Sequence, residues 1–330
     1  MLEHGGRLQR AVQQYAIPRA QWLDLSSGIA PWSFAIPPIP EQAWARLPET
    51  DDGLEQAAVQ YYQARQVLPV AGSQAAIQAL PQLRARGTVG VLSPCYAEHA
   101  EGWRRAGHRV LELNPDQVEG LLDSLDALVV VNPNNPTGSL LKADQLLGWH
   151  ARLARRGAWL LLDEAFMDNT PQFSIGAQAG QPGLIVLRSF GKFFGLAGVR
   201  LGFVLAEAEL LQRLAELLGP WTVSGPTRIL GQSCLLDSAA QQRQIARCAE
   251  ASQRLASLMT GAGFTPTGGC DLFQYLVTDQ AMRLHEFMAR RGILLRLFNQ
   301  PASLRFGLPA SEQDFQRLAQ AFNDYRKETL

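Results

Sequence analysis

The chain has 330 residues, of which 47% are hydrophobic and 18% charged, a composition typical of a globular protein with a substantial core. Its length is enough for about two lobes. Thirty basic and thirty acidic residues cancel, so the charge balance gives no reason to expect nucleic acid or an anionic membrane as a partner.

The first segment, MLEHGGRLQRAVQQY, is polar and lacks the apolar run of a signal peptide. No later stretch has the uninterrupted apolar length of a membrane span. Four scattered cysteines, at positions 95, 234, 248 and 270, form no CxxC pair and have no histidine at ligand spacing. We therefore expect a cytoplasmic protein with reduced thiols, no disulfide and no metal.

Residues 1–45 contain Pro31, Pro37, Pro38 and Pro40 and are expected to form an extended arm. From about residue 66, short apolar segments alternate with segments of helical spacing such as ADQLLGWHARLARRG. The expected strands are VLPVAGS, TVGVLS, HRVLEL, ALVVVN, AWLLLD, GLIVLRS and RLGFVLA. Continuously apolar strands separated by helices predict a mostly parallel sheet covered on both faces, which is a three-layer αβα domain.

Beyond about residue 225 the pattern changes to a long helical region, followed by FTPTGGCDLFQYLVT, a helix, GILLRLF, SLRFGLP and a final helix. This order predicts a small α+β domain. We expect an arm and part of the small domain in 1–44, a large domain in 45–225 and the small carboxyl-terminal domain in 226–330.

Polar clusters follow four of the predicted strands, where a parallel sheet places its ligand sites. They are AGSQA (71–75), NPNNPTG (132–138), DEAF (163–166) and SFGK (189–192). Each cluster alone has a structural explanation, since Asn, Pro and Gly are common in turns and Ser and Asp are common helix caps. Four of them at the strand ends of one sheet point to a single site.

The segment RSFGKFFGLAGVRLGF places Lys192 among aromatic and small residues. Burial disfavours a charged ammonium group, and a lysine with a lowered pKa is a nucleophilic amine that forms a Schiff base with an aldehyde. The segment by itself also fits a solvated loop lysine beside a buried strand.

Taken together, NPNNPTG, DEAF, SFGK and GLAGVRLG resemble the signature motifs of the class I/II aminotransferase family, which are fold type I pyridoxal-phosphate (PLP) enzymes. The resemblance runs over most of the chain and implies pyridoxal 5'-phosphate as cofactor. Lys192 would bind its aldehyde, and Asp163 would keep its pyridine nitrogen protonated. Asn135 would donate a hydrogen bond to its phenolate oxygen, and Tyr96 would stack on the ring.

The same resemblance implies a phosphate site for the cofactor. Ser73 and Gln74 would offer backbone N–H groups at the start of a helix. Ser189 would add a hydroxyl, and Arg200 in GLAGVRLG would reach inward as the matching cation.

The amino-terminal HGG, followed by LDLSSGIAPW, resembles a decarboxylating branch of the family that acts on O-phospho-L-threonine in cobalamin biosynthesis. Phe166 stands in DEAF where many aminotransferases have tyrosine, as in that branch. The expected substrate is a small phosphorylated amino acid. His4, Gly28 and Arg305 are the expected substrate-binding residues, with Arg305 holding the α-carboxylate by two hydrogen bonds.

Three positions depart from the family pattern. Leu47 occupies the position at which relatives offer a tyrosine across the dimer interface, Ala30 replaces a common asparagine, and Arg7 follows HGG where asparagine is common. The resemblance also implies a homodimer with active sites near the interface.

Two alternatives of different class stay open on the sequence. A histidinol-phosphate aminotransferase shares the same core motifs and would need 2-oxoglutarate. A serine hydrolase would use AGSQA as a loose nucleophile elbow with Asp163 and His285, although the motif lacks the usual glycines.

Overall fold

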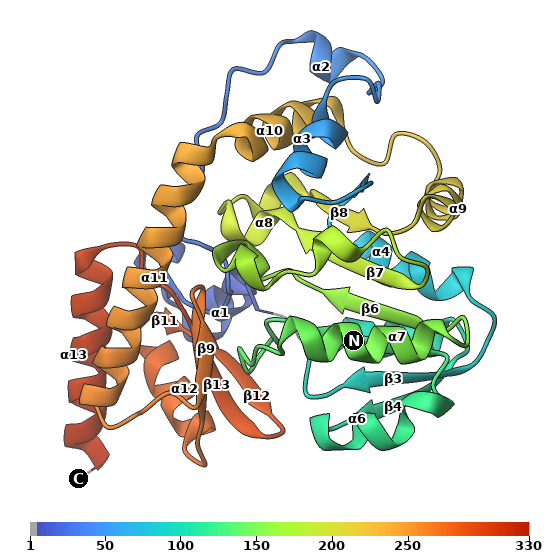
Figure 1. Cartoon of the computed structure of the whole chain (residues 1–330). Helices are drawn as coiled ribbons and strands as arrows, with labels where there is room; N and C mark the ends of the chain where they lie inside the picture. Colours follow the sequence, from blue (N-terminus) through green and yellow to red (C-terminus); the bar gives the residue numbers. More distant parts are fainter. Residues whose placement is uncertain (1–4, 330) are drawn as a thin grey trace. The chain divides into compact units, whose positions relative to one another are not determined.

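The apolar segments predicted as strands form one seven-stranded sheet in the computed structural model, which describes residues 5–329 (Figure 1). The chain divides into two compact units, described here one at a time. Unit 1 comprises Met1–Trp32, Pro136–Ser139 and Arg243–Leu330, and unit 2 comprises Ser33–Asn135 and Leu140–Gln242.

The sheet of unit 2 has the order β2-β8-β7-β6-β5-β3-β4. Strands β3 to β7 run parallel to their neighbours within this set, whereas β8 is antiparallel to both β7 and β2. The prediction of a mostly parallel sheet is therefore confirmed. The strands are β2 (Leu68–Val70), β3 (Thr88–Leu92), β4 (Arg109–Leu113), β5 (Ala127–Val131), β6 (Trp159–Asp163), β7 (Leu184–Ser189) and β8 (Gly202–Leu205).

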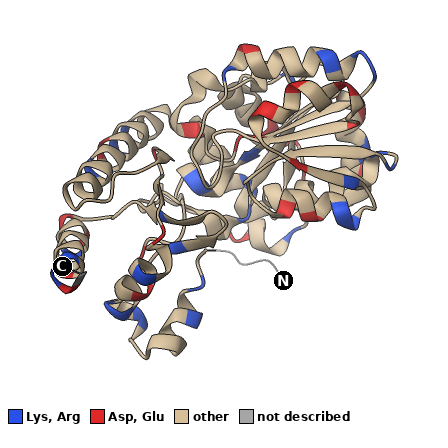
Figure 2. Ribbon diagram, turned by 90° about the horizontal axis from the view of Figure 1, so that it is seen from below, with Lys and Arg blue, Asp and Glu red and all other residues tan. Residues whose placement is uncertain are grey.

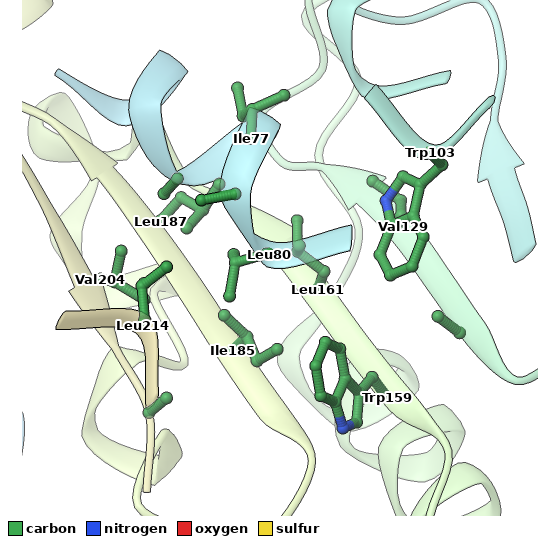
Figure 3. Packing of buried hydrophobic residues seen from close by; sticks show 14 of the residues in the cluster. Ile77, Leu80, Trp103, Val129, Trp159, Leu161, Ile185, Leu187, Val204 and Leu214 are labelled. Atoms are coloured by element: carbon green, nitrogen blue, oxygen red, sulfur yellow. The ribbon is translucent and has the colours of Figure 1, made fainter. Parts of the chain in front are cut away.

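Alternate side chains of the central strands pack on opposite faces of this sheet, as the pleat requires. On one face, Ile77 of α4 and Leu80 of the following turn cover Leu161, Ile185 and neighbouring strand residues (Figure 3). Helix α7 contacts β6 and buries its own apolar stripe. The helices of unit 2 are α2 (Gln42–Ala45), α3 (Leu54–Tyr62), α4 (Ser73–Ala79), α5 (Glu98–Arg105), α6 (Pro115–Leu121), α7 (Ala143–Ala154), α8 (Phe190–Phe193), α9 (Ala208–Leu218) and α10 (Gly225–Leu236).

Unit 1 is the predicted α+β region. An antiparallel sheet of order β12-β13-β10-β9 packs with helices, and β1 pairs in parallel with β11. Its strands are β1 (Leu23–Asp24), β9 (Gly268–Cys270), β10 (Phe273–Val277), β11 (Ile293–Leu294), β12 (Arg296–Asn299) and β13 (Ala302–Gly307). Its helices are α1 (Leu8–Tyr15), α12 (Ala281–Arg290), α13 (Glu312–Thr329) and the greater part of α11 (Ser238–Gly261).

The division between the units after residue 242 falls inside α11, and a short piece of the NPNNPTG loop, Pro136–Ser139, belongs to unit 1. The sequence instead placed domain boundaries after residues 44 and 225. Those boundaries stay a prediction.

Charged residues of both signs are interspersed along the outer helices (Figure 2). Within residues 5–329, no helix combines the length and the apolar character needed to span a bilayer.

Candidate active site

Three of the predicted site segments meet at the carboxyl edge of the central strands. Val131 at the end of β5 lies opposite Asp163 at the end of β6, and the N–H of Asn132 donates to the carbonyl of Asp163 at 2.9 Å. The next residue, Glu164, donates its N–H to the carbonyl of Leu187 on β7 at 2.9 Å. Parallel pairing therefore aligns NPNNPTG, DEAF and SFGK side by side, as the motif positions predicted.

Asp163 is a buried carboxylate with two hydrogen-bond donors. Its side chain accepts from Nε2 of His99 at 2.8 Å and from the N–H of Ala165 at 3.0 Å. Asp163 is 3% exposed and His99 1% exposed, so water does not replace either contact. Because an ionised carboxylate only accepts hydrogen bonds, Nε2 of His99 carries the shared proton. The arrangement places two hydrogen-bond donors against the carboxyl group at the end of β6.

Lys192 lies in α8, the short helix that follows β7. It is half-buried, and its Nζ lies 5.8 Å from the ring centroid of Phe166, which is itself buried. Phe190 and Phe193, on either side of it in this helix, are fully buried. The predicted apolar setting of this lysine is therefore present, with Phe166 of DEAF supplying part of it.

The turn that begins α4 approaches Arg200 and β8 closely. Gly72 has φ of +75°, and a Cβ placed on it would come within 2.6 Å of Nη2 of Arg200. A Cβ on Gly202 would come within 2.5 Å of the N–H nitrogen of Ser73. Arg200 itself has φ of +57° and is exposed, so its guanidinium lies over Gly72 at the surface of unit 2 instead of reaching into the protein as predicted.

Ser189, the fourth residue of the predicted phosphate site, pairs with Gly202 across β7 and β8. Three adjacent segments of unit 2 thus supply three kinds of donor. These are the Ser189 hydroxyl, the N–H groups of the first turn of α4, and the Arg200 guanidinium. This set of donors suits a phosphate group.

Tyr96 and Gln74 are joined directly. The Tyr96 hydroxyl donates to Oε1 of Gln74 at 3.0 Å, and Nε2 of Gln74 donates to Oε2 of Glu98 at 3.0 Å. The Tyr96 ring meets the His99 ring edge-on, with centroids 6.1 Å apart. Asn135, predicted to contact the cofactor, is half-buried in the loop after β5.

In unit 1, the other predicted site segments converge on Ser26. Nη2 of Arg305 on β13 donates to the Ser26 carbonyl at 3.1 Å, and the N–H of Gly6 donates to Oγ of Ser26 at 2.8 Å. Gly5 also lies against the Ser26 carbonyl, too closely for a side chain. Gly28 is buried, whereas His4 lies outside the described residues. Gly5 and Gly6, LDLSSGI and SLRFGLP therefore come together around residues 24–28.

Arg305 is a buried cation. It is 6% exposed, its guanidinium lies 5.1 Å from the ring centroid of Phe273, and burial lowers its pKa to about 10. It stays charged at neutral pH, since that value is still well above 7. The described residues contain no group of three or more His, Cys, Asp or Glu side chains that could hold a metal ion.

Residues 40–322 match the family model for aminotransferase class I and II. The chain belongs to the class I and II aminotransferase family. It is 63% identical over 327 residues, 99% of both chains, to a threonine-phosphate decarboxylase from Pseudomonas aeruginosa. It is 41% identical, over 96% of both chains, to a threonine-phosphate decarboxylase from Sinorhizobium sp..

Among solved structures, the histidinol-phosphate aminotransferase of Sinorhizobium meliloti in complex with pyridoxal-5'-phosphate superposes with a TM-score of 0.84. The match covers 100% of this chain and 96% of the other, at 19% identity, and establishes the fold. The serine-hydrolase alternative does not fit a chain of this family, and the Asp163 carboxylate that it would use accepts instead from Nε2 of His99.

Sequence reasoning on this family member missed the buried partners of the motif residues. Arg188, which precedes SFGK, donates to Glu164 of DEAF at 2.6 Å and to Asp168 at 2.8 Å, with all three side chains at most 2% exposed. Its guanidinium also lies 4.6 Å from the ring centroid of Tyr62. Burial raises the pKa of Glu164 despite these contacts. The ion pair joins the β6 loop, which carries Asp163, to the end of β7.

Leu47, expected at the position where relatives offer a tyrosine across the dimer interface, is 63% exposed in the single chain. Its side chain has no hydrogen-bond donor, so it could not make the contact expected of that tyrosine. Ala30, the second departure from the family pattern, is buried.

Proposed function

We propose that this chain is a PLP-dependent decarboxylase that converts O-phospho-L-threonine to 1-amino-2-propanol phosphate and CO2. The observation that carries the proposal is the 63% identity, over 99% of both chains, to the threonine-phosphate decarboxylase from Pseudomonas aeruginosa. The product would supply the aminopropanol arm in cobalamin biosynthesis.

The residues of unit 2 fit this cofactor. A lysine lies beside the buried ring of Phe166, and a buried carboxylate ends β6. At Gly72 and Gly202 the backbone packs so closely against Arg200 and Ser73 that neither position has room for a Cβ. When bound, PLP supplies a protonated ring that accepts the electron pair left at the substrate Cα as CO2 leaves.

Each residue then has a distinct task. Lys192 would hold the cofactor aldehyde through Nζ, and its amine would be the group available to return a proton to the substrate Cα. Asp163, held by His99, would keep the ring nitrogen protonated. Asn135 would donate a hydrogen bond to the phenolate oxygen, and Tyr96 would stack on the ring.

At the phosphate end, the N–H groups of Ser73 and Gln74, the Ser189 hydroxyl and Arg200 would hold the dianion. The closeness of Arg200 to Gly72 supports this assignment. The cation and the first-turn amides would then act on the same oxygens.

For the substrate, we assign the α-carboxylate to Arg305, whose buried guanidinium already donates to the Ser26 carbonyl and so has a fixed orientation. Gly28, two residues further along, would provide backbone contacts. His4 would contribute to holding the substrate phosphate. These assignments rest on the convergence of the three segments around residues 24–28.

The second candidate is a histidinol-phosphate aminotransferase, which is expected to share the core motifs NPNNPTG, DEAF and SFGK. The two reactions separate in one experiment. The purified protein with PLP is incubated with O-phospho-L-threonine or histidinol phosphate, each with and without 2-oxoglutarate. Release of CO2 from the first, independent of 2-oxoglutarate, is expected; amino transfer from histidinol phosphate without CO2 release would replace the proposal.

Cofactor attachment has a direct test, because the chain contains only three lysines, at positions 142, 192 and 327. Borohydride reduction followed by peptide mapping should place the label on Lys192. Lys192→Ala should remove the visible absorbance of the bound cofactor and lower turnover by several orders of magnitude. Lys142→Ala, which changes an exposed lysine, is the matched control and should behave as wild type.

We also propose a homodimer. Large apolar side chains of unit 2, including Trp44, Leu47 and Trp221, are at least 60% exposed in the single chain, and a second copy would cover such surface. Light scattering should give twice the mass of one chain; a monomer that retains full activity would contradict it. The cytoplasmic location stays a prediction.

A further inference from the structure

The side chain of Gln74 has no task in the function proposed above, which uses only its backbone N–H. Yet both ends of its amide are engaged within unit 2. Oε1 accepts from the Tyr96 hydroxyl and Nε2 donates to Glu98, each at 3.0 Å. One residue at the start of α4 is thereby connected to Tyr96, just before α5, and to Glu98, the first residue of α5.

The two hydrogen bonds fix each other's direction. A carboxylate only accepts, so Glu98 requires the NH2 end of the Gln74 amide, and this leaves the oxygen end facing Tyr96. The Tyr96 proton is then directed toward Gln74. Burial raises the pKa of Tyr96 to about 12, with the nearby charge of Glu98 adding to the effect, so this hydroxyl stays neutral at physiological pH.

The orientation of the Tyr96 ring matters for the candidate active site because the ring packs against His99, the hydrogen-bond donor to Asp163. The Tyr96 ring meets His99 at an interplanar angle of 84°, and His99 donates to Asp163 at 2.8 Å. The chain of contacts therefore runs from the first turn of α4, where a phosphate would be held, to the carboxylate at the end of β6.

We propose that Gln74 is a positioning residue that holds the Tyr96 ring in the orientation needed to stack on the cofactor, with Glu98 setting the direction of the Gln74 amide. This inference rests on the proposed function, since it requires that PLP binds. It assigns to the side chain of Gln74 a task separate from the backbone contact with phosphate.

Gln74→Leu removes both hydrogen bonds while keeping the helix and the backbone N–H. We expect the apparent Kd for PLP, measured by titrating apoprotein without substrate, to rise about 2- to 10-fold, the range for loss of one or two modest hydrogen bonds. The circular dichroism band of the bound cofactor should also change. The matched control is Gln78→Leu, one turn further along the same helix face and exposed, which should change neither.

Tyr96→Phe removes only the hydroxyl and should give a similar spectral change. Combined with Gln74→Leu it should add little, because both variants remove the same interaction. Full additivity in this double-mutant cycle would overturn the inference.

A charge-neutral exchange provides the sharpest test. Gln74→Glu alone brings two carboxylates to hydrogen-bond distance and should weaken PLP binding further. Adding Glu98→Gln restores one amide and one carboxylate in exchanged positions, so the Kd should return toward wild type. Two results would refute the role of Gln74 while leaving the proposed function intact. One is that Glu98→Gln does not restore the Kd for PLP in the Gln74→Glu variant. The other is that Gln74→Leu has the same Kd for PLP as the Gln78→Leu control. A wild-type protein that does not bind PLP would refute both.

Discussion

Replacement of His99 by leucine should show how much the buried donor beside Asp163 contributes. The substitution leaves one oxygen of a carboxylate that is 3% exposed without its 2.8 Å donor, while the N–H of Ala165 still serves the other oxygen. A hydrogen bond to a charged group contributes about 1.5–3 kcal/mol. We therefore expect the free energy of unfolding of the apoprotein to fall by about 1.5–3 kcal/mol.

The same loss should affect the site. If Asp163 is no longer held, its negative charge is less well placed beside the cofactor nitrogen, and kcat should fall about 10- to 100-fold, equivalent to about 1.4–2.7 kcal/mol. Urea unfolding of apoprotein, PLP titration and steady-state decarboxylation measure the three quantities separately.

His150→Leu is the matched control. His150 is also buried, on α7, but its Nε2 contacts the carbonyl of Pro182, just before the amino end of β7 and so at the opposite edge of the sheet. This variant should lose stability while retaining cofactor affinity and kcat per folded molecule. Equal effects of the two variants on kcat would refute the reasoning, because they would reduce the role of His99 to packing.

Three further outcomes are expected. Asp163→Asn should retain bound cofactor but slow decarboxylation by a few orders of magnitude, because the side chain keeps its shape and loses its charge. Single-turnover kinetics measure the chemical step, and an unchanged rate would mean that Asp163 has only a structural role. Arg305→Lys removes the two parallel N–H donors of the guanidinium, so it should raise KM for O-phospho-L-threonine. Some turnover should then proceed as amino transfer, which is detected as the pyridoxamine form of the cofactor. Unchanged kinetics would show that another group orients the carboxylate. Asp52→Asn should destabilise the protein at neutral pH, and this effect should shrink as the pH is lowered through the folded-state pKa of Asp52. Burial raises the pKa of Asp52, but hydrogen bonds from Arg228 and the Leu54 N–H outweigh burial, so the folded-state pKa lies below the ordinary 3.8. The contribution of the carboxylate is therefore complete above 3.8 and is lost as pH falls through the lowered pKa. A pH-independent difference in urea midpoint between Asp52→Asn and wild type would contradict this assignment.

The motif residues could be predicted because each motif directly follows its strand in the sequence, and each of these strands is a short continuous run of apolar residues. Each strand of the parallel core is a short apolar run, so the residues that follow it, such as Asn132, Asp163 and Ser189, must share one edge of the sheet. Family resemblance then supplied their roles. None of this required knowledge of how helices pack.

The partners of those residues could not be predicted in the same way. His99 lies three residues after Tyr96, a spacing that puts both on one side of the α5 start, but only the packing of α5 against the strands brings its ring to Asp163. The side chain of Gln74 likewise meets Tyr96 across 22 positions of sequence. Such contacts depend on where the helices and strands lie in three dimensions. The local pattern of apolar and polar residues carries no information about those positions.

By itself, then, the sequence determined the mostly parallel sheet, the edge at which the strand-end motifs gather, and which lysine and carboxylate we propose for the site, because strand periodicity and strand-end motifs are local properties. Only the tertiary structure decided that Arg188 pairs with Glu164 and Asp168 in the interior, that Arg200 lies exposed over Gly72, and that Gly5, Gly6 and Arg305 all contact Ser26. The physical reason is burial: a charge in a low-dielectric interior needs a partner, and which partner it finds depends on segments that are distant in the chain.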